Sequence, residues 1–131
     1  MLRHLQRRHP IGEVGQVVEG RDLPQLAELV WEVHVDDTVA EYVVALVQAT
    51  RSHPDLTLGA SPRGSLALFK GAQALAAIRG RDFVKPDDVK ELVVPTLAHR
   101  LILKPESALR GRTVDGVLRQ VLESAAVELG E

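Results

Sequence analysis

The sequence predicts an all-α fold, a small bundle of five or six helices. Apolar residues recur at helical spacing in several segments, which is the pattern of helices with one buried face. Aromatic residues make up only 3% of the chain, so leucine, valine and alanine must supply the core volume, as they do between packed helices. The length of 131 residues, with 45% hydrophobic and 26% charged residues, fits one globular domain.

Residues 1–22 are expected to form a short helix and a loop. Met1–Arg8 is predicted to be helical, and His9-Pro10 ends this helix because the residue before a proline is pushed out of the helical region. Glycines between residues 10 and 22 indicate a loop. Asp22 is then expected to cap a helix whose apolar set is Leu26, Leu29, Val30 and Val33.

The next segment carries the clearest amphipathic pattern of the chain. Asp36 or Asp37 is expected to cap a helix that ends near residues 51–54. Its predicted buried stripe is Val39, Tyr42, Val43, Leu46 and Val47.

A long helix is predicted from Pro62 to about Arg79, stopped by Gly80. The Ser61 hydroxyl is expected to accept a hydrogen bond from a first-turn amide, and Pro62 suits the first helical position, where no amide donor is missed. A helical wheel places one face toward the core, consisting of Leu68, Phe69, Ala72, Leu75 and Ala76.

Two more helices are expected in the remainder. One begins at Pro86 and continues, kinked or restarted by Pro95, to Leu103. Residues 104–112 are predicted to be a loop, and Thr113 is expected to cap the last helix. The apolar stripe of that helix is Val114, Val117, Leu118, Val121, Leu122, Ala125 and Leu129.

Three short pieces favour extended structure, at residues 33–35, 56–58 and 83–84. If they pair, the bundle carries a minimal sheet with very short β pairs.

Arg63 is the residue that first suggests a function. It falls in the opening turn of the long helix, where a cation opposes the helix dipole at a cost of roughly a few tenths of a kcal/mol unless an anion is bound there. A guanidinium beside free helix amides is a candidate phosphate site. Lys70 lies on the same face two turns away, too far to reach the same phosphate. The competing interpretation is an ordinary solvated basic face.

Several function classes find no support in the residues. The net charge of −2 and the lack of a basic recognition helix argue against nucleic-acid binding. No apolar run reaches the roughly 20 residues that span a membrane. The absence of cysteine excludes thiol chemistry, and the five scattered histidines predict no metal site. No phosphate-binding glycine loop or catalytic signature is present, so the chain alone does not resemble an enzyme.

Three motifs together carry a family resemblance: Gly59–Gly64 with the helix after it, Gly80–Val89, and His99-Arg100-Leu101. In this order and spacing, they resemble the C-terminal lid of AAA+ ATPases of the MoxR family. The resemblance covers about residues 36–103, and more weakly the rest of the chain.

The resemblance implies a helical domain that follows a nucleotide-binding α/β domain. Arg63 matches the sensor 2 arginine, which reaches the phosphates of ATP, and Ser61 and Pro62 would line the lid side of the pocket. ATP and Mg²⁺ would be bound mainly by the α/β domain, whose Walker motifs are absent from this sequence, so no ATPase activity is expected of this chain by itself.

The resemblance also implies partners. MoxR-like proteins are ATP-driven, chaperone-like machines, usually hexameric, that assemble or activate other proteins, insert metal cofactors, and often work with von Willebrand factor A domain proteins. The expected partners are therefore the chain's own α/β domain, neighbouring subunits and a von Willebrand factor A domain protein, in the cytoplasm. On this interpretation, residues 1–22 are the junction to the α/β domain and residues 23–131 are the lid.

Two alternatives stay open. One is a helical protein-interaction module without a nucleotide role, and the other is a DNA-binding helical domain. Testing Arg63 in a protein that includes the α/β domain separates the first from the lid. Salt-dependent DNA binding would be the signature of the second.

Overall fold

A computed structural model describes residues 14–128, and these residues form six α-helices, one 3₁₀ helix and a two-stranded sheet, which confirms the all-α class. The elements in chain order are α2 (Asp22–Trp31), α3 (Asp37–Ser52), β1 (Leu56–Leu58), α4 (Pro62–Ile78), α5 (Pro86–Leu97), η2 (Ala98–Arg100), β2 (Ile102–Leu103), α6 (Pro105–Leu109) and α7 (Val114–Glu128). The helix predicted at Met1–Arg8 lies outside the described residues, as does Leu129.

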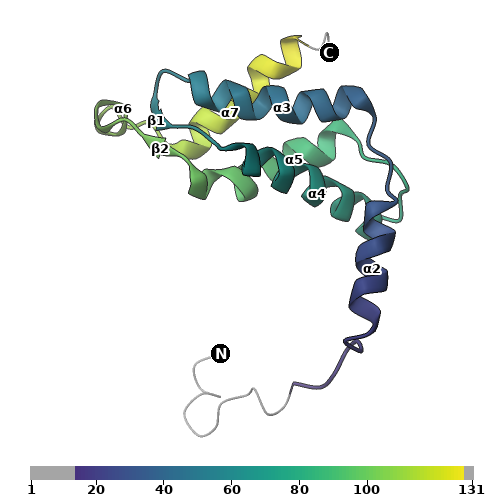
Figure 1. The fold of residues 1–131 in the computed structure, drawn as a ribbon. Helices are drawn as coiled ribbons and strands as arrows, with labels where there is room; N and C mark the ends of the chain where they lie inside the picture. The colour runs from purple at the N-terminus through teal and green to yellow at the C-terminus, as the bar shows by residue number, and fades with distance from the viewer. Residues whose placement is uncertain (1–13, 129–131) are drawn as a thin grey trace, which may run out of the picture.

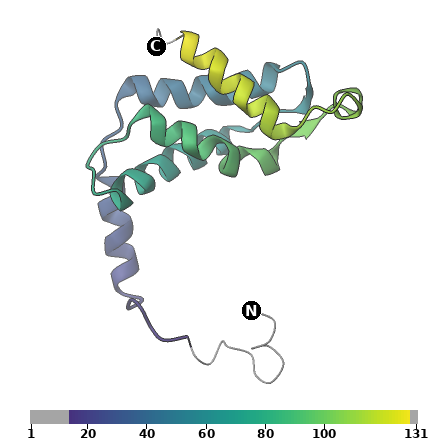
Figure 2. The ribbon, with the colours of Figure 1, turned by 180° about the vertical axis from the view of Figure 1, so that it is seen from behind.

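Four helices enclose the core. Helix α4 packs against α3 and α5, and α7 closes the other side against the same two helices (Figure 1). From behind, α7 crosses α3 at an angle (Figure 2). The buried apolar residues come mainly from these four helices: Val39, Tyr42, Val43, Leu46, Val47, Leu68, Ala72, Ala76, Val89, Val93, Leu97, Val117, Leu118, Val121 and Ala125.

Helix α3 forms where its sequence signals place it. The Asp36 carboxylate accepts hydrogen bonds from the Thr38 amide (2.9 Å) and the Thr38 hydroxyl (2.6 Å), which satisfies a free donor of the first turn. All five residues of the predicted stripe are buried. The helix ends at Ser52, within the expected range.

Helix α4 also has the predicted limits. It begins at Pro62 and is followed by Gly80, whose φ of 68° is the left-handed conformation that glycine adopts without strain. The Gly80 amide donates to Ala77 O and the Arg81 amide to Ala76 O, the pair of bonds that closes a Schellman motif. The Ser61 side chain makes no cap hydrogen bond, so that part of the prediction was wrong: Ser61 occupies the N-cap position only by its extended backbone.

The extended pieces do pair, but not all with one another. His34 and Phe83 form an isolated parallel bridge, joined by bonds from the His34 amide to Asp82 O and from the Val84 amide to His34 O. Strand β1 instead pairs antiparallel with β2, Leu56 opposite Leu103. The prediction that the helix after Pro86 continues to Leu103 was therefore wrong, because this pairing holds residues 102–103 extended.

Residues 104–112 are not wholly a loop as predicted, since α6 occupies Pro105–Leu109. Pro105 provides the first helical position. The buried Ser107 hydroxyl donates to the Asp55 carboxylate at 2.8 Å, which holds this short helix beside the residue that precedes β1. The start of α7 agrees with the prediction, because the Gly116 amide donates to the Thr113 hydroxyl at 3.1 Å.

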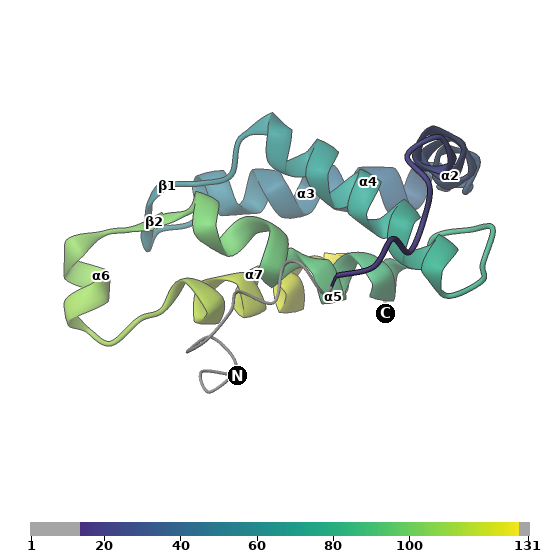
Figure 3. The same ribbon diagram turned by 90° about the horizontal axis from the view of Figure 1, so that it is seen from below.

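Helix α2 stands apart from the bundle and packs against α4 (Figures 1 and 3). Asp22 is its first residue and not its cap: the N-cap position is Arg21, and the Asp22 carboxylate accepts from the Glu19 amide. None of the ten residues of α2 is buried. Its exposed apolar residues, including Leu26 and Leu29, form a face that nothing within residues 14–128 covers.

Candidate functional site

The segment Gly59–Gly64 begins in close contact with the C-terminal end of α3. A Cβ atom on Gly59 would come within 2.5 Å of the Arg51 Cα and 2.6 Å of the Thr50 carbonyl oxygen, so only glycine fits between these backbones. The next residue, Ala60, is buried, and its amide donates to the Thr50 hydroxyl at 3.0 Å. The loop into α4 is therefore fixed on α3 by a close backbone contact and a hydrogen bond.

The first turn of α4 is packed as closely against α5. A Cβ on Gly64 would lie 3.0 Å from Leu97 Cδ2 and 3.3 Å from Ala60 Cβ. The Gly64 amide donates to Ser61 O at 2.7 Å, which tightens the turn. The small residues of the motif thus place the start of α4 against two neighbouring helices.

Arg63 is the second residue of α4 and is exposed. Across residues 14–128, no side chain forms an ion pair or hydrogen bond with its guanidinium. The structure therefore places Arg63 as the sequence predicted, in the first turn of a helix and exposed to solvent. A free guanidinium beside first-turn amides can bind a phosphate oxygen pair in bidentate fashion.

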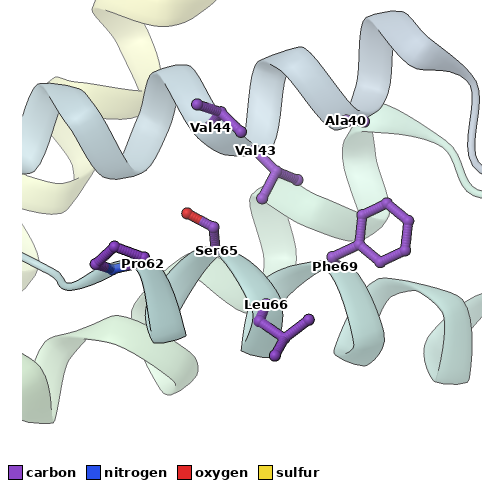
Figure 4. Close-up of a pocket in the computed structure, with 7 residues that line it drawn as sticks. All are labelled: Ala40, Val43, Val44, Pro62, Ser65, Leu66 and Phe69. Carbon is purple, nitrogen blue, oxygen red and sulfur yellow. The ribbon is translucent and has the colours of Figure 1, made fainter.

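An apolar groove of about 410 Å³ lies between α3 and α4, next to this turn (Figure 4). Pro62 contributes to its wall, whereas Ser61 does not line it. The other lining residues are Ala40, Val43 and Val44 of α3 and Ser65, Leu66 and Phe69 of α4.

Lys70, the second cation of this face, is engaged within the chain. Its ammonium donates to Gln73 Oε1 at 3.1 Å and lies 5.3 Å from the centre of the Trp31 ring. Gln73 in turn donates to Val33 O at 2.8 Å. Lys70 and Gln73 thus hold the end of α2 against α4.

The second motif of the resemblance builds a buried ion-pair cluster. Asp88, only 1% exposed, accepts from Arg81 at 2.8 and 2.6 Å, from Arg79 at 3.1 Å and from the Lys85 amide at 2.9 Å. The hydrogen bonds from Arg81 lower the pKa of Asp88 below its ordinary value of 3.8, against the opposing effect of burial. Arg79 also pairs with Glu91 at 2.7 Å. The cluster fixes the turn between α4 and α5.

Sequence reasoning recognised only part of this arrangement. The expected helix start at Pro86 puts Asp88 in the first turn, where it accepts from the Lys85 amide, but no sequence pattern pairs it with the two arginines. Sequence reasoning also missed Thr50, because no local pattern marks a hydroxyl whose partner lies ten residues along the chain. Arg100 is the last residue of η2 and donates to Thr96 O at 3.1 Å.

A sequence profile of the AAA lid domain matches residues 48–121, which include Arg63 and the Asp88 cluster. The chain belongs to the AAA lid domain family. The resemblance to a MoxR-family lid is thereby confirmed, and the relatives agree with it.

Two curated relatives and one solved structure are similar over most of this chain. YeaC of Bacillus subtilis is 41% identical over 122 residues, which are 93% of this chain and 38% of YeaC. Chaperone MoxR1 of Mycobacterium tuberculosis is 35% identical over 86% of this chain and 32% of its own length. The crystal structure of a candidate ATPase from Cytophaga hutchinsonii has a TM-score of 0.81 and 26% identity, covering 93% of this chain and 40% of that one.

The chain therefore spans only about a third to two fifths of the length of these relatives. Within residues 14–128, no group of three or more His, Asp or Glu side chains is placed to hold a metal ion. No helix in the same part of the chain is long and apolar enough to cross a membrane.

Proposed function

We propose that this chain is the nucleotide-sensing lid of a MoxR-like AAA+ ATPase, and that Arg63 acts as its sensor 2 residue on the phosphates of ATP. The observation that carries the proposal is the exposed Arg63 guanidinium at the first turn of α4, without a partner among residues 14–128 and held by a tightly packed loop. Membership of the AAA lid domain family supports the choice of nucleotide over other anions.

In this proposal, the lid and the α/β domain have separate parts in the reaction. Arg63 supplies positive charge to the phosphates, and Ser61 and Pro62 form the adjoining wall. Binding of Mg²⁺ is proposed for the α/β domain, as the family resemblance implies. A guanidinium that contacts only the triphosphate state makes the position of the lid depend on hydrolysis.

The proposed partners are the chain's own α/β domain and neighbouring subunits of a ring, in the cytoplasm. The exposed apolar face of α2, formed by Leu23, Leu26 and Leu29, supports a covering domain. A von Willebrand factor A domain protein as a further partner rests on the family resemblance alone, as does chaperone-like assembly or cofactor insertion.

The same apolar surfaces also favour the second candidate, a helical protein-interaction module without a nucleotide role. The two functions differ in what they require of Arg63. An interaction module predicts that its charge is dispensable for ATP turnover by the full-length protein.

Replacing Arg63 with alanine in the full-length protein is expected to lower the kcat for ATP hydrolysis about ten- to hundredfold, since a hydrogen bond to a charged group contributes roughly 1.5–3 kcal/mol. Thermal unfolding of the 131-residue chain should be unchanged, because the side chain is exposed and forms no hydrogen bond or ion pair with residues 14–128. Arg119→Ala, which removes an exposed arginine of α7, is the matched control and should hydrolyse ATP at the normal rate. A normal kcat in Arg63→Ala would refute the sensor role and favour the interaction module.

A further inference from the structure

Thr50 makes two hydrogen bonds in the interior, at the place where the loop into α4 touches α3. Its side chain is 0% exposed. The hydroxyl donates to Val47 O at 2.7 Å, within α3, and accepts from the Ala60 amide at 3.0 Å. The hydroxyl donates its one hydrogen and accepts one bond from the opposite side, so its orientation is fixed.

This contact is the last fixed point before Arg63. Ala60 is buried, and Gly59 is in direct contact with the backbone of Thr50 and Arg51. Between Ala60 and Arg63 lie only Ser61, whose side chain makes no cap bond, and Pro62, whose ring fixes φ. The direction in which α4 begins is therefore set on the α3 side by the contact between Ala60 and Thr50, and on the α5 side by the packing of Gly64 against Leu97.

Loss of the hydroxyl would leave the buried Ala60 amide without an acceptor. A buried donor without an acceptor raises the free energy of the folded state. The loop would lower that free energy by moving away from α3 until water reaches the Ala60 amide. Such a movement shifts the start of α4, and Arg63 with it, while the rest of the bundle keeps its packing.

We propose that Thr50 is a positioning residue for Arg63. The inference rests on the proposed sensor role of Arg63, and it adds that the Thr50–Ala60 hydrogen bond holds the guanidinium where it meets the phosphates. Thr50 itself is buried beneath the loop and touches no nucleotide.

The test compares Thr50→Val, which keeps the shape and removes the hydroxyl, with Thr50→Ser, which keeps the hydroxyl, in the full-length protein. Thr50→Val is expected to lower kcat for ATP hydrolysis about tenfold, the order of effect that a small misplacement of a catalytic group produces. Thr50→Ser should restore kcat to within about twofold of wild type. Val121→Ala, which truncates a buried side chain of α7 outside the residues that hold this loop, is the control for loss of stability alone and should keep its kcat.

The decisive measurement repeats Thr50→Val in the Arg63→Ala background. If Thr50 acts through Arg63, Thr50→Val has no further effect on kcat there. An equal loss of kcat in both backgrounds, or a normal kcat in Thr50→Val alone, would overturn the positioning role. A normal kcat in Thr50→Val together with a lowered kcat in Arg63→Ala would refute the positioning role and leave the sensor role intact. A normal kcat in Arg63→Ala would refute the sensor role itself.

If Thr50→Val does not fold, Thr50→Cys takes its place in the test. Thr50→Cys keeps a weak acceptor in the same place, so its kcat is expected between those of Thr50→Ser and Thr50→Val. Measured in the same two backgrounds, Thr50→Cys supports the role only if its loss of kcat disappears when Arg63 is alanine.

Discussion

Replacing Asp88 with alanine is expected to lower the free energy of unfolding by about 3 kcal/mol, a large part of the stability of a domain of this size. The carboxylate is buried, and its removal leaves Arg81 and Arg79 without their shared partner and the Lys85 amide without an acceptor. We place the effect at the lower end of the range for broken buried ion pairs because both arginines reach solvent. Urea unfolding of the 131-residue chain measures it.

The pH dependence of stability provides a separate check on the same cluster. The pKa of Asp88 is lowered in the folded state, so the stability that its charge contributes is complete above its unfolded value near 3.8 and is lost as the pH falls through the lower folded value. Asp88→Asn keeps the shape and lacks the charge. The difference in stability between wild type and Asp88→Asn should therefore be constant from pH 7 to 5 and shrink below about pH 4. A difference that grows with acidification would contradict the assigned ion pairs.

Replacing Gly59 with alanine is expected to cost about 2–3 kcal/mol, because the added methyl group must push two backbones apart. The nearest atoms are the Arg51 Cα at 2.5 Å and the Thr50 carbonyl oxygen at 2.6 Å, and neither is the end of a flexible side chain. The loop is expected to lift from α3 and to lose the Thr50–Ala60 hydrogen bond. A fall in the midpoint of thermal unfolding, together with faster exchange of the Ala60 amide, would show this.

A glycine in open space supplies the control for that change. A Cβ on Gly20 meets nothing within 4 Å, so Gly20→Ala should leave stability unchanged or slightly higher. If Gly59→Ala proved as stable as Gly20→Ala, the close approach of the loop to α3 would not be a constraint.

Local signals were enough to predict α3 and α4, the two helices that the Gly59–Gly64 segment joins. The cap at Asp36 and the stripe of α3 depend on residues within a few turns, and so do Pro62 at the start of α4 and Gly80 at its end. The position of Arg63 follows from these same signals, since a residue directly after an N1 proline must lie in the first turn. Its exposure and lack of a partner could be expected from the helical wheel.

Features that depend on distant contacts could not be predicted in this way. Helix α6 has five residues, too few to show a helical period, and it is held by Ser107 against Asp55, 52 residues away. Strand β2 is extended because β1 lies beside it. The exposed face of α2 has the periodicity of a buried helix, and sequence alone does not say whether the covering surface belongs to the same domain.

The Asp88 cluster gives a physical account of one of the three motifs on which the resemblance rests. Arg81 and Asp88 form the buried pair, and the Arg81 guanidinium also donates to Phe83 O at 2.9 Å. Pro86 begins the helix that carries Asp88. This motif therefore supports the lid structurally, while the Gly59–Gly64 motif presents Arg63, for which we propose the sensor role.

Labelling of arginines by phenylglyoxal in the full-length protein, with the modified sites identified by mass spectrometry, tests the central claim most directly. We expect Arg63 to react readily without nucleotide and with ADP, and to be protected by a non-hydrolysable ATP analogue, while Arg119 reacts equally in all three states. The same rate of Arg63 modification in all three states would contradict a contact between its guanidinium and the triphosphate.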